Sequence, residues 1–326
     1  MQAGGGQGDK NVSRLHVFAV EYLCAINHAD AEAGQVVLVL GVEAGHLGRL
    51  AADQRAGGLH AALRNAGDDL RDALRGGGGD STEPGFVSGK SGLDRNVRFG
   101  VVGATAHFQV GFDSSGDSPV AYGGHSAETI NYVSCHDDLS LVDKLRASAP
   151  EGMTEEELVR FDKLAQTVVL TAQGIPSLFA GEEMLRTKGG VSNSHDSPDR
   201  VNRIDWSFKA DHKDVFDYYR GLIALRRTHP AFRLATAAEI ERHLRFLDTG
   251  DTHVVAYMLV DHAGDDPWRE ILVVYNGARA EKRVRIPPGD WHAVCLDGRI
   301  ASEALAVFSG DSVPVPASSA LIAYLP

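Results

Sequence analysis

Cysteine is scarce in this chain, and the few cysteines present stand far apart. Cys24, Cys135 and Cys295 are odd in number and form no CxxC pair, so the sequence favours neither a disulfide framework nor a zinc knuckle. No stretch reaches about 18 apolar residues, so we expect no membrane-spanning helix. The opening segment MQAGGGQGDKNVSR lacks the apolar core of a secretory signal, which favours a cytoplasmic protein.

Positive charge is also in deficit. The chain has 32 Lys and Arg residues against 44 Asp and Glu residues, a formal net charge of −12. Because an acidic surface repels polyanions, we expect neither nucleic acid nor an anionic membrane as a partner. The 326 residues, 43% hydrophobic and 23% charged, are typical of a globular protein with two domains, or with one large domain and a small appendage.

Three regions of the chain differ in composition and hydrophobic pattern, and we predict a domain division at each boundary between them. Residues 1–65 are rich in Ala, Gly and Arg. Residues 66–234 alternate segments typical of strands with segments typical of helices. Residues 235–326 alternate apolar and polar positions between predicted turns such as HAGDDP, IPPGD and FSGD. The sequence therefore predicts an α/β region followed by an antiparallel β-sandwich.

The middle region contains two predicted βα units. The segments TINYVSC (129–135) and IPSLFAG (175–181) are typical of buried strands. Between them, TEEELVRFDKLAQTVVLTAQG has helical apolar spacing and opens with a capping box of Thr154 and Glu157. A further helix is predicted over DVFDYYRGLIALRRT, ending before Pro230. This order of elements requires a parallel sheet, and sites form at the carboxyl ends of its strands.

The motif CHDD follows the first of these strands and has four interpretations. One is a loop turn in which Asp137 or Asp138 caps the next segment. Another is a metal site of the His-Asp phosphohydrolase kind, which needs further ligands on helices. A Cys135 nucleophile beside His136 is disfavoured, because neighbouring residues of a strand point to opposite faces. The fourth is carbohydrate chemistry, since Asp and His bind sugar hydroxyls and a carboxylate stabilises an oxocarbenium-like transition state.

A second polar cluster follows the second strand. The segment GEEMLRTKGGVSNSHDSPDRVNRIDW (181–206) has no periodicity, and loops of this length are functional or only solvated surface. Four of its side chains offer a partner to sugar hydroxyls: Asn193, Asp199, Asn202 and Arg203. We expect Trp206 at its end to pack in the core rather than stack on a sugar ring.

Five segments carry a family resemblance. They are DDLRDALRGG, GFVSGKSGLDRNVRFGVVGAT, ETINYVSCHDDLSLVDKL, KLAQTVVLTAQGIPSLFAGEEMLRTKGGVSNSHDSPDRVNRIDWS and FDYYRGLIALRRTHPAFR. In this order and spacing they resemble the last third of type I pullulanases, debranching enzymes of the α-amylase family (glycoside hydrolase family 13). The resemblance covers residues 66–326.

The resemblance implies a fold, a reaction and a set of site residues. The fold is α/β: the C-terminal portion of a (β/α)8 TIM barrel over residues 66–234, followed by an all-β antiparallel sandwich. The reaction is retaining hydrolysis of α-1,6 branch linkages in pullulan, glycogen or amylopectin fragments, as in starch and glycogen debranching. Asp137 matches the family's transition-state stabiliser, and His136 matches the sugar-binding residue before it. The donor-side subsites would be lined by Arg186, Asn193, Asp199 and Asn202.

The sequence departs from the family in several places. Asp138 stands where pullulanases commonly have Asn, and His195-Asp196 stands where they commonly have Tyr-Asn. The family's nucleophile motif, Gly-Phe-Arg-Phe-Asp, does not occur. The nearest match to its general-acid motif, Tyr-Gly-Glu-Gly-Trp, is QVVLVLGVEAGHLG, where Glu43 follows a predicted strand. Glu43 is therefore the candidate general acid, with an ordinary surface glutamate as the alternative.

Residues 1–65 resemble the family poorly, and their Ala, Gly, Arg and His bias is typical of a GC-rich gene translated out of frame. We therefore expect a chain that is truncated or frameshifted at its N-terminus. Three functions stay open: an incomplete pullulanase-type hydrolase, a non-catalytic α-glucan-binding protein, and a standalone hydrolase using Glu43 with Asp137 or Asp138. An α-glucan is the expected partner. No cofactor or metal is expected, and no calcium site is visible in the sequence.

Overall fold

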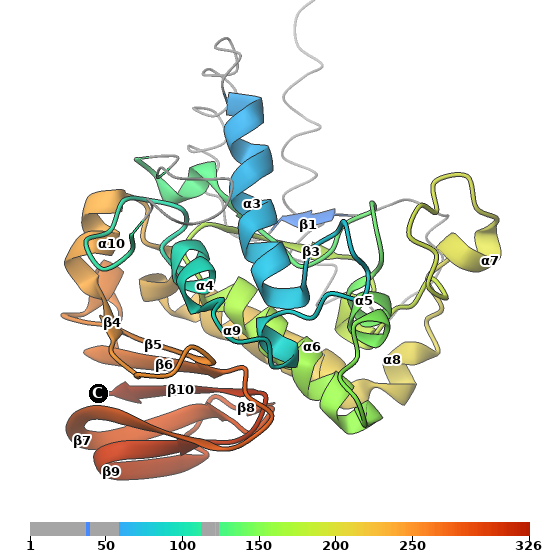
Figure 1. Cartoon of the computed structure of the whole chain (residues 1–326). Coiled ribbons are helices and arrows are strands. Elements are labelled where there is room, and N and C mark those ends of the chain that lie inside the picture. The colour runs from blue at the N-terminus through green and yellow to red at the C-terminus, as the bar shows by residue number, and fades with distance from the viewer. Residues whose placement is uncertain (1–36, 40–58, 112–120, 122–123) are drawn as a thin grey trace, which may run out of the picture.

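The computed structural model describes residues 37–39, 59–111, 121 and 124–326 (Figure 1). The α-helices are α3 (Leu59–Arg75), α4 (Asp94–Val101), α5 (Leu141–Ala147), α6 (Glu155–Thr171), α7 (Asp199–Asn202), α8 (Phe208–Asp211), α9 (Lys213–Thr228) and α10 (Ala237–His243). Short 3-10 helices are η1 (Phe86–Ser88), η2 (Ser126–Glu128), η3 (Glu182–Met184), η4 (Pro230–Arg233) and η5 (Ala263–Asp265). In the described ranges, no helix is both long enough and apolar enough to pass through a lipid bilayer.

The strands divide into a small sheet and a large one. The small sheet holds β1 (Val37–Val39), β2 (Ile130–Asn131) and β3 (Ile175–Phe179). The large sheet holds β4 (Leu244–Leu247), β5 (Val254–Leu259), β6 (Glu270–Asn276), β7 (Lys282–Leu296), β8 (Arg299–Ile300), β9 (Ala306–Val315) and β10 (Ser319–Leu325). Figure 1 shows the large sheet, which forms the C-terminal part of the chain, lying against the helices.

The small sheet contains the predicted parallel pair. β2 and β3 run parallel, with Ile130 opposite Ile175, as the two βα units require. The strand predicted before Glu43 also forms, as β1, but it runs antiparallel to β3. A complete (β/α)8 barrel has only parallel strands, so the antiparallel β1 is a departure from that fold. It can form because an unpaired strand edge accepts a partner of either direction. β2 is shorter than predicted and ends at Asn131, so residues 132–135 lie outside the ladder.

The helix between β2 and β3 forms as its sequence predicts. Thr154 is the N-cap of α6, its side chain accepts a hydrogen bond from the Glu157 backbone N–H, and Glu157 returns a bond to the Thr154 N–H. Its apolar side chains Leu158, Phe161 and Ala165 are fully buried. The next predicted helix is α9, which stops before Pro230 as expected. Together α6 and α9 cover the side of the small sheet where the core lies.

The large sheet is antiparallel throughout and has the order β4-β5-β6-β10-β7-β8, with β9 paired to β7. Two predicted turns are wrong here. IPPGD lies inside β7, where the register against β9 shifts between Arg285 and Gly289. FSGD lies inside β9. A shift of register leaves residues without ladder partners, so the two prolines fit within a strand that the sequence pattern splits in two.

Alternation along the strands of the large sheet builds two cores. In β5, Val255, Tyr257 and Leu259 belong to the core shared with the helices. The intervening side chains of β5 join a second core with side chains of β6, β7, β9 and β10, including the fully buried Trp291. One path of hydrogen-bonded strands lines both sides of this second core, so the predicted sandwich is a single sheet that folds over its own outer face.

Candidate active site

The candidate site begins where β2 ends. Past Asn131 the chain leaves the sheet and presents His136 and Asp137, whose side chains are 53% and 72% exposed. The Nε2 atom of His136 lies 3.5 Å from Oδ2 of Asp137. The structure therefore brings the two predicted residues together, in a position that a ligand can reach. The GEEM segment follows β3, so both polar clusters lie at the carboxyl ends of paired parallel strands, as predicted.

Asp138 turns the chain sharply after the pair. Its φ of 59° lies in the left-handed region, which Asn and Asp adopt more readily than most residues. Replacing the family's Asn by Asp therefore keeps the turn. Arg75, a buried residue of α3, holds it: Nη1 donates to the Leu139 carbonyl at 2.9 Å, and Nη2 lies 3.6 Å from Oδ2 of Asp138.

Cys135 differs from expectation in its position. The ligand atoms of Cys135, His136 and Asp137 all lie within 4.8 Å of one another. The prediction that adjacent residues would point apart is wrong here, because β2 has already ended and strand alternation no longer applies. Burial raises the pKa of the Cys135 thiol, which argues against a thiolate nucleophile in the free protein.

The loop after β3 is fastened to this site by Lys188. Its ammonium donates to the His136 carbonyl at 3.2 Å and to Oγ of Ser194 at 2.8 Å. Its backbone N–H donates to Asp143 of α5 at 2.7 Å. Burial lowers the pKa of Lys188, and the nearby Arg186 adds to that effect. Sequence reasoning missed Lys188 and Asp143, because their contacts join loops that are far apart in the sequence.

The predicted loop residues divide into buried and exposed ones. Arg186 is buried, donates to the carbonyls of Ala180 (2.9 Å) and Asn202, and lies over the Phe179 ring, 4.9 Å from its centroid. The side-chain amide of Asn202 donates to the carbonyls of Ser194 (2.6 Å) and Ser197 (3.1 Å). Both therefore shape the loop from within.

Three other predicted residues are exposed, and a fourth lies outside the described part of the chain. Asn193 is exposed, and its Oδ1 lies 2.9 Å from Nδ1 of His195. Asp199 is exposed at the start of α7, and Arg203 is exposed just after that helix. Glu43 lies outside the described residues.

Beneath the site lies a buried carboxylate. Glu182 accepts hydrogen bonds from Ser134, two residues before His136, from Nε2 of Gln166 at 2.9 Å and from the Phe179 backbone N–H at 3.2 Å. Burial outweighs these bonds and raises the pKa of Glu182 to about 8. This residue therefore joins the segment after β2 to α6 and to the end of β3.

Two more buried carboxyl groups surround Glu182. Asp162 of α6 accepts a hydrogen bond from the Tyr219 hydroxyl at 2.8 Å, and burial raises its pKa to about 7. Glu183 accepts from the Gly181 backbone N–H at 2.9 Å, and burial raises its pKa as well. Such a cluster keeps protons on carboxyl groups near neutral pH and makes the support of the site sensitive to pH.

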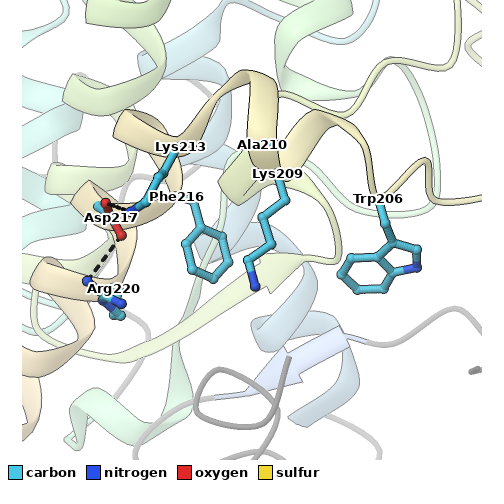
Figure 2. Close-up of a pocket in the computed structure, with 7 residues that line it drawn as sticks. All are labelled: Trp206, Lys209, Ala210, Lys213, Phe216, Asp217 and Arg220. Atoms are coloured by element: carbon cyan, nitrogen blue, oxygen red, sulfur yellow. Dashed lines mark hydrogen bonds and ion pairs between the residues drawn. The ribbon is translucent and has the colours of Figure 1, made fainter. Parts of the chain in front are cut away.

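An open hollow of about 400 Å³ lies beside the end of the polar loop (Figure 2). Trp206 lines it and is 42% exposed, so the expectation that Trp206 packs in the core is wrong. Across the hollow, the Lys209 ammonium lies 4.5 Å from the centroid of the Phe216 ring. Figure 2 shows Lys213 and Arg220 paired with Asp217 along α9; the Arg220 Nη2 lies 3.1 Å from Oδ1. The hollow is thus rimmed by Trp206, which precedes α8, and by the Phe216 ring and charged groups of α8 and α9.

Comparison with known proteins gives a consistent set of relatives. A family model described as "Pullulanase, all-beta domain" matches residues 240–299, inside the predicted C-terminal region. The pullulanase of Bacillus subtilis (strain 168) is 34% identical over 220 residues, which cover 68% of this chain and 29% of that protein. Pullulanase 1, chloroplastic, of Arabidopsis thaliana is 28% identical over 209 residues, covering 50% of this chain and 22% of that protein. The chain therefore spans less than a third of these relatives.

Solved structures agree with the sequence relatives. A pullulanase from Bacillus acidopullulyticus superposes with a TM-score of 0.72 at 41% identity, covering 79% of this chain and 30% of that one. A pullulanase from Paenibacillus barengoltzii, solved in complex with maltohexaose and α-cyclodextrin, superposes with a TM-score of 0.68 at 39% identity, covering 79% and 38%. With the sequence relatives and the matched all-β domain, these similarities show that the chain belongs to the pullulanase family of glycoside hydrolases.

Proposed function

We propose that this chain takes part in the hydrolysis of α-1,6-glucosidic linkages in pullulan, glycogen or amylopectin fragments, and that the glucan binds at His136 and Asp137. The observation that carries the proposal is the position of this exposed pair at the carboxyl end of β2, beside the polar loop that follows β3. The pullulanase from Paenibacillus barengoltzii described above was solved with maltohexaose and α-cyclodextrin, and a mutant of it was solved with maltotriose.

Asp137 has the chemistry of a transition-state stabiliser. Its exposed carboxylate can lie against the positive charge that develops when a glycosidic bond breaks. His136, 3.5 Å away, can donate a hydrogen bond to a hydroxyl of the same sugar ring. The backbone of the pair is held by Lys188 on one side and by the Arg75-fixed turn on the other. These contacts limit how far the two side chains can drift, which transition-state stabilisation requires.

A retaining glycosidase also needs a nucleophile and a general acid about 5 Å apart. Asp137 fills neither of these roles in the proposed mechanism. Glu43 stays our candidate for the general acid, and the family's nucleophile motif does not occur in the sequence. The chain's part in the reaction is therefore glucan recognition and stabilisation of the transition state.

The test combines binding with turnover. Maltotriose binding is measured by titration calorimetry, and reducing-sugar release is measured on pullulan, for the unchanged chain and for Asp137→Asn. Loss of a charged hydrogen-bond partner is worth about 1.5–3 kcal/mol, so we expect binding to weaken by roughly 10- to 100-fold and any release to stop. Asp138→Asn is the matched control: it also removes one carboxylate, and its turn accepts Asn.

Each outcome has a distinct meaning. Release that stops in Asp137→Asn but continues in Asp138→Asn supports the proposed hydrolase. Maltotriose binding without release would favour the non-catalytic glucan-binding alternative. A chain that neither binds maltotriose nor releases sugar, or whose two variants behave alike, contradicts the proposed site.

A further inference from the structure

Three different donor atoms converge at the tip of the segment after β2. The thiol of Cys135, a ring nitrogen of His136 and a carboxylate oxygen of Asp137 lie within 4.8 Å of one another. The thiol is partly covered, while His136 and Asp137 are exposed. Sugar binding calls for the imidazole and the carboxylate, but it does not require a thiol beside them.

We propose that Cys135, His136 and Asp137 bind a zinc-class divalent cation, and that the bound metal blocks the candidate glucan site. Sulfur and imidazole donors select zinc-class metals, whereas calcium and magnesium prefer oxygen donors only. The metal site rests on the donor geometry alone. Only the blocking effect rests on the proposed function.

The distances suit a tetrahedral ion. Zinc binds sulfur at about 2.3 Å and nitrogen or oxygen at about 2.0–2.2 Å, which puts tetrahedral donors roughly 3.4–3.6 Å apart. His136 Nε2 and Asp137 Oδ2 are 3.5 Å apart, which already meets that spacing. The remaining donor pairs are within 4.8 Å, so an adjustment of about 1 Å in side-chain position closes the set. The exposure of His136 and Asp137 leaves a fourth position for water.

Positive groups lie near the three donors. Arg75 faces the Asp138 carboxylate, which offsets its charge, whereas Lys188 donates to the neutral oxygens of the His136 carbonyl and of Ser194 and keeps its charge. Binding of a cation here therefore depends on two anionic ligands that outweigh this repulsion. On binding, the Cys135 thiol releases one proton to solvent and becomes a thiolate. The two positive charges of the metal then meet one thiolate and one carboxylate, so the occupied site is neutral and needs no oxidant or reductant.

The bound metal would prevent glucan binding for a simple reason. It occupies the Asp137 carboxylate and the His136 nitrogen, the groups that the proposed function gives to the sugar. Zinc and maltotriose should therefore compete for one site.

The experiment uses the untagged full chain with Cys24→Ser, which removes the thiol that lies outside the described residues. Co²⁺ is added and the thiolate-to-cobalt charge-transfer band in the near ultraviolet is followed, with Zn²⁺ as the displacing ion. We expect one cobalt per chain. Cys135→Ser should abolish the band and His136→Ala should weaken binding about tenfold or more. Asp311→Asn, which removes an exposed carboxylate of β9 outside the donor set, is the matched control and should keep the band.

The second arm is maltotriose titration with and without one equivalent of Zn²⁺. Weaker maltotriose binding in the presence of zinc, restored in Cys135→Ser, supports the competition. Absence of the cobalt band, or a band that survives in Cys135→Ser while circular dichroism shows an unchanged fold, overturns the metal site. A cobalt band in a chain that does not bind maltotriose supports the metal site and counts against the proposed function, so the two failures are distinguishable.

Discussion

The C-terminal sheet and the region that carries His136 and Asp137 differ in what they bury. All six residues of β5 are buried, and their side chains are apolar except for the Tyr257 hydroxyl, which donates to the Thr171 carbonyl. They divide between two hydrophobic cores. Beneath the site, by contrast, the buried groups include the carboxyl groups of Asp162, Glu182 and Glu183. Gln166 of α6 donates a hydrogen bond to Glu182 of η3. One region is stabilised by removing apolar surface from water, and the other depends on hydrogen bonds to carboxyl groups.

The two regions should respond to different solution conditions. Apolar burial has no titratable group and changes little with pH. Buried carboxyl groups with raised pKa values lose their protons as pH rises, and each lost proton leaves a charge in the interior. We therefore expect the sheet to respond to lost volume and the site region to respond to pH.

The largest effect should come from the sheet. Trp291 is fully buried in the second core, and its indole N–H donates to the Pro287 carbonyl at 2.9 Å. Trp291→Ala should lower the free energy of unfolding by about 3–5 kcal/mol, because it empties a large cavity and leaves a carbonyl unpaired. Urea unfolding measures the loss. Val307→Ala, at a β9 position that is 52% exposed, should change stability by less than about 0.5 kcal/mol, and equal losses in the two variants would contradict this account of the sheet.

The next effect should come from pH and from Glu182. Its pKa is about 8 in the fold against an ordinary value of 4.5 for a glutamate, so between these limits the folded state holds a proton that the unfolded state has lost. Stability from this group is complete below pH 4.5 and falls as pH rises toward 8. The slope is about 1.4 kcal/mol per pH unit for each such proton. Asp162, with a pKa of about 7, acts in the same direction over a lower range.

The measurement is urea unfolding at several pH values from 5 to 8. Glu182→Gln removes one titrating proton and keeps the shape of the side chain, so stability should fall less steeply with pH. Glu303→Gln makes the same change of charge at an exposed position and should keep the original slope. If Glu182→Gln and the unchanged chain lose stability in parallel, Glu182 does not titrate in the way its burial requires.

Much of the fold was predictable, because its elements carry local patterns. The capping box of Thr154 and Glu157 marked the start of α6, and short apolar runs between predicted turns marked β5, β6 and β10. The errors came where tertiary pairing overrode a local pattern. The proline-rich turn predicted inside β7 is held in strand by β9, and the strand predicted to reach Cys135 ends at Asn131.

The candidate site was predictable only in part. His136 and Asp137 follow a strand, so their exposure at its end could be inferred. Lys188, Asp143 and Glu182 act across loops and helices far apart in the sequence, and no spacing rule joins such residues. The role predicted for Arg186 came from the family resemblance, and that of Asn202 came from the resemblance and its residue type. In the fold both side chains bond to nearby backbone carbonyls. Polar residue type alone does not distinguish a ligand contact from a loop support.

The smallest loss of stability should come from removing a helix N-cap, and it should be equal in the two regions. It tests whether the two regions differ only in their buried residues. Thr154 caps α6 and Thr236 caps α10; in each case the threonine hydroxyl accepts a bond from the backbone N–H of a glutamate at 3.2 Å. Thr154→Ala and Thr236→Ala should each cost about 1 kcal/mol, because an N-cap acts locally at an exposed helix end. Thr→Ser at either position keeps the hydroxyl and should recover most of the loss. If Thr154→Ala lost far more stability than Thr236→Ala, the N-terminus of α6 would be coupled to the buried carboxyl groups of that helix. The difference between the two regions would then extend to exposed residues.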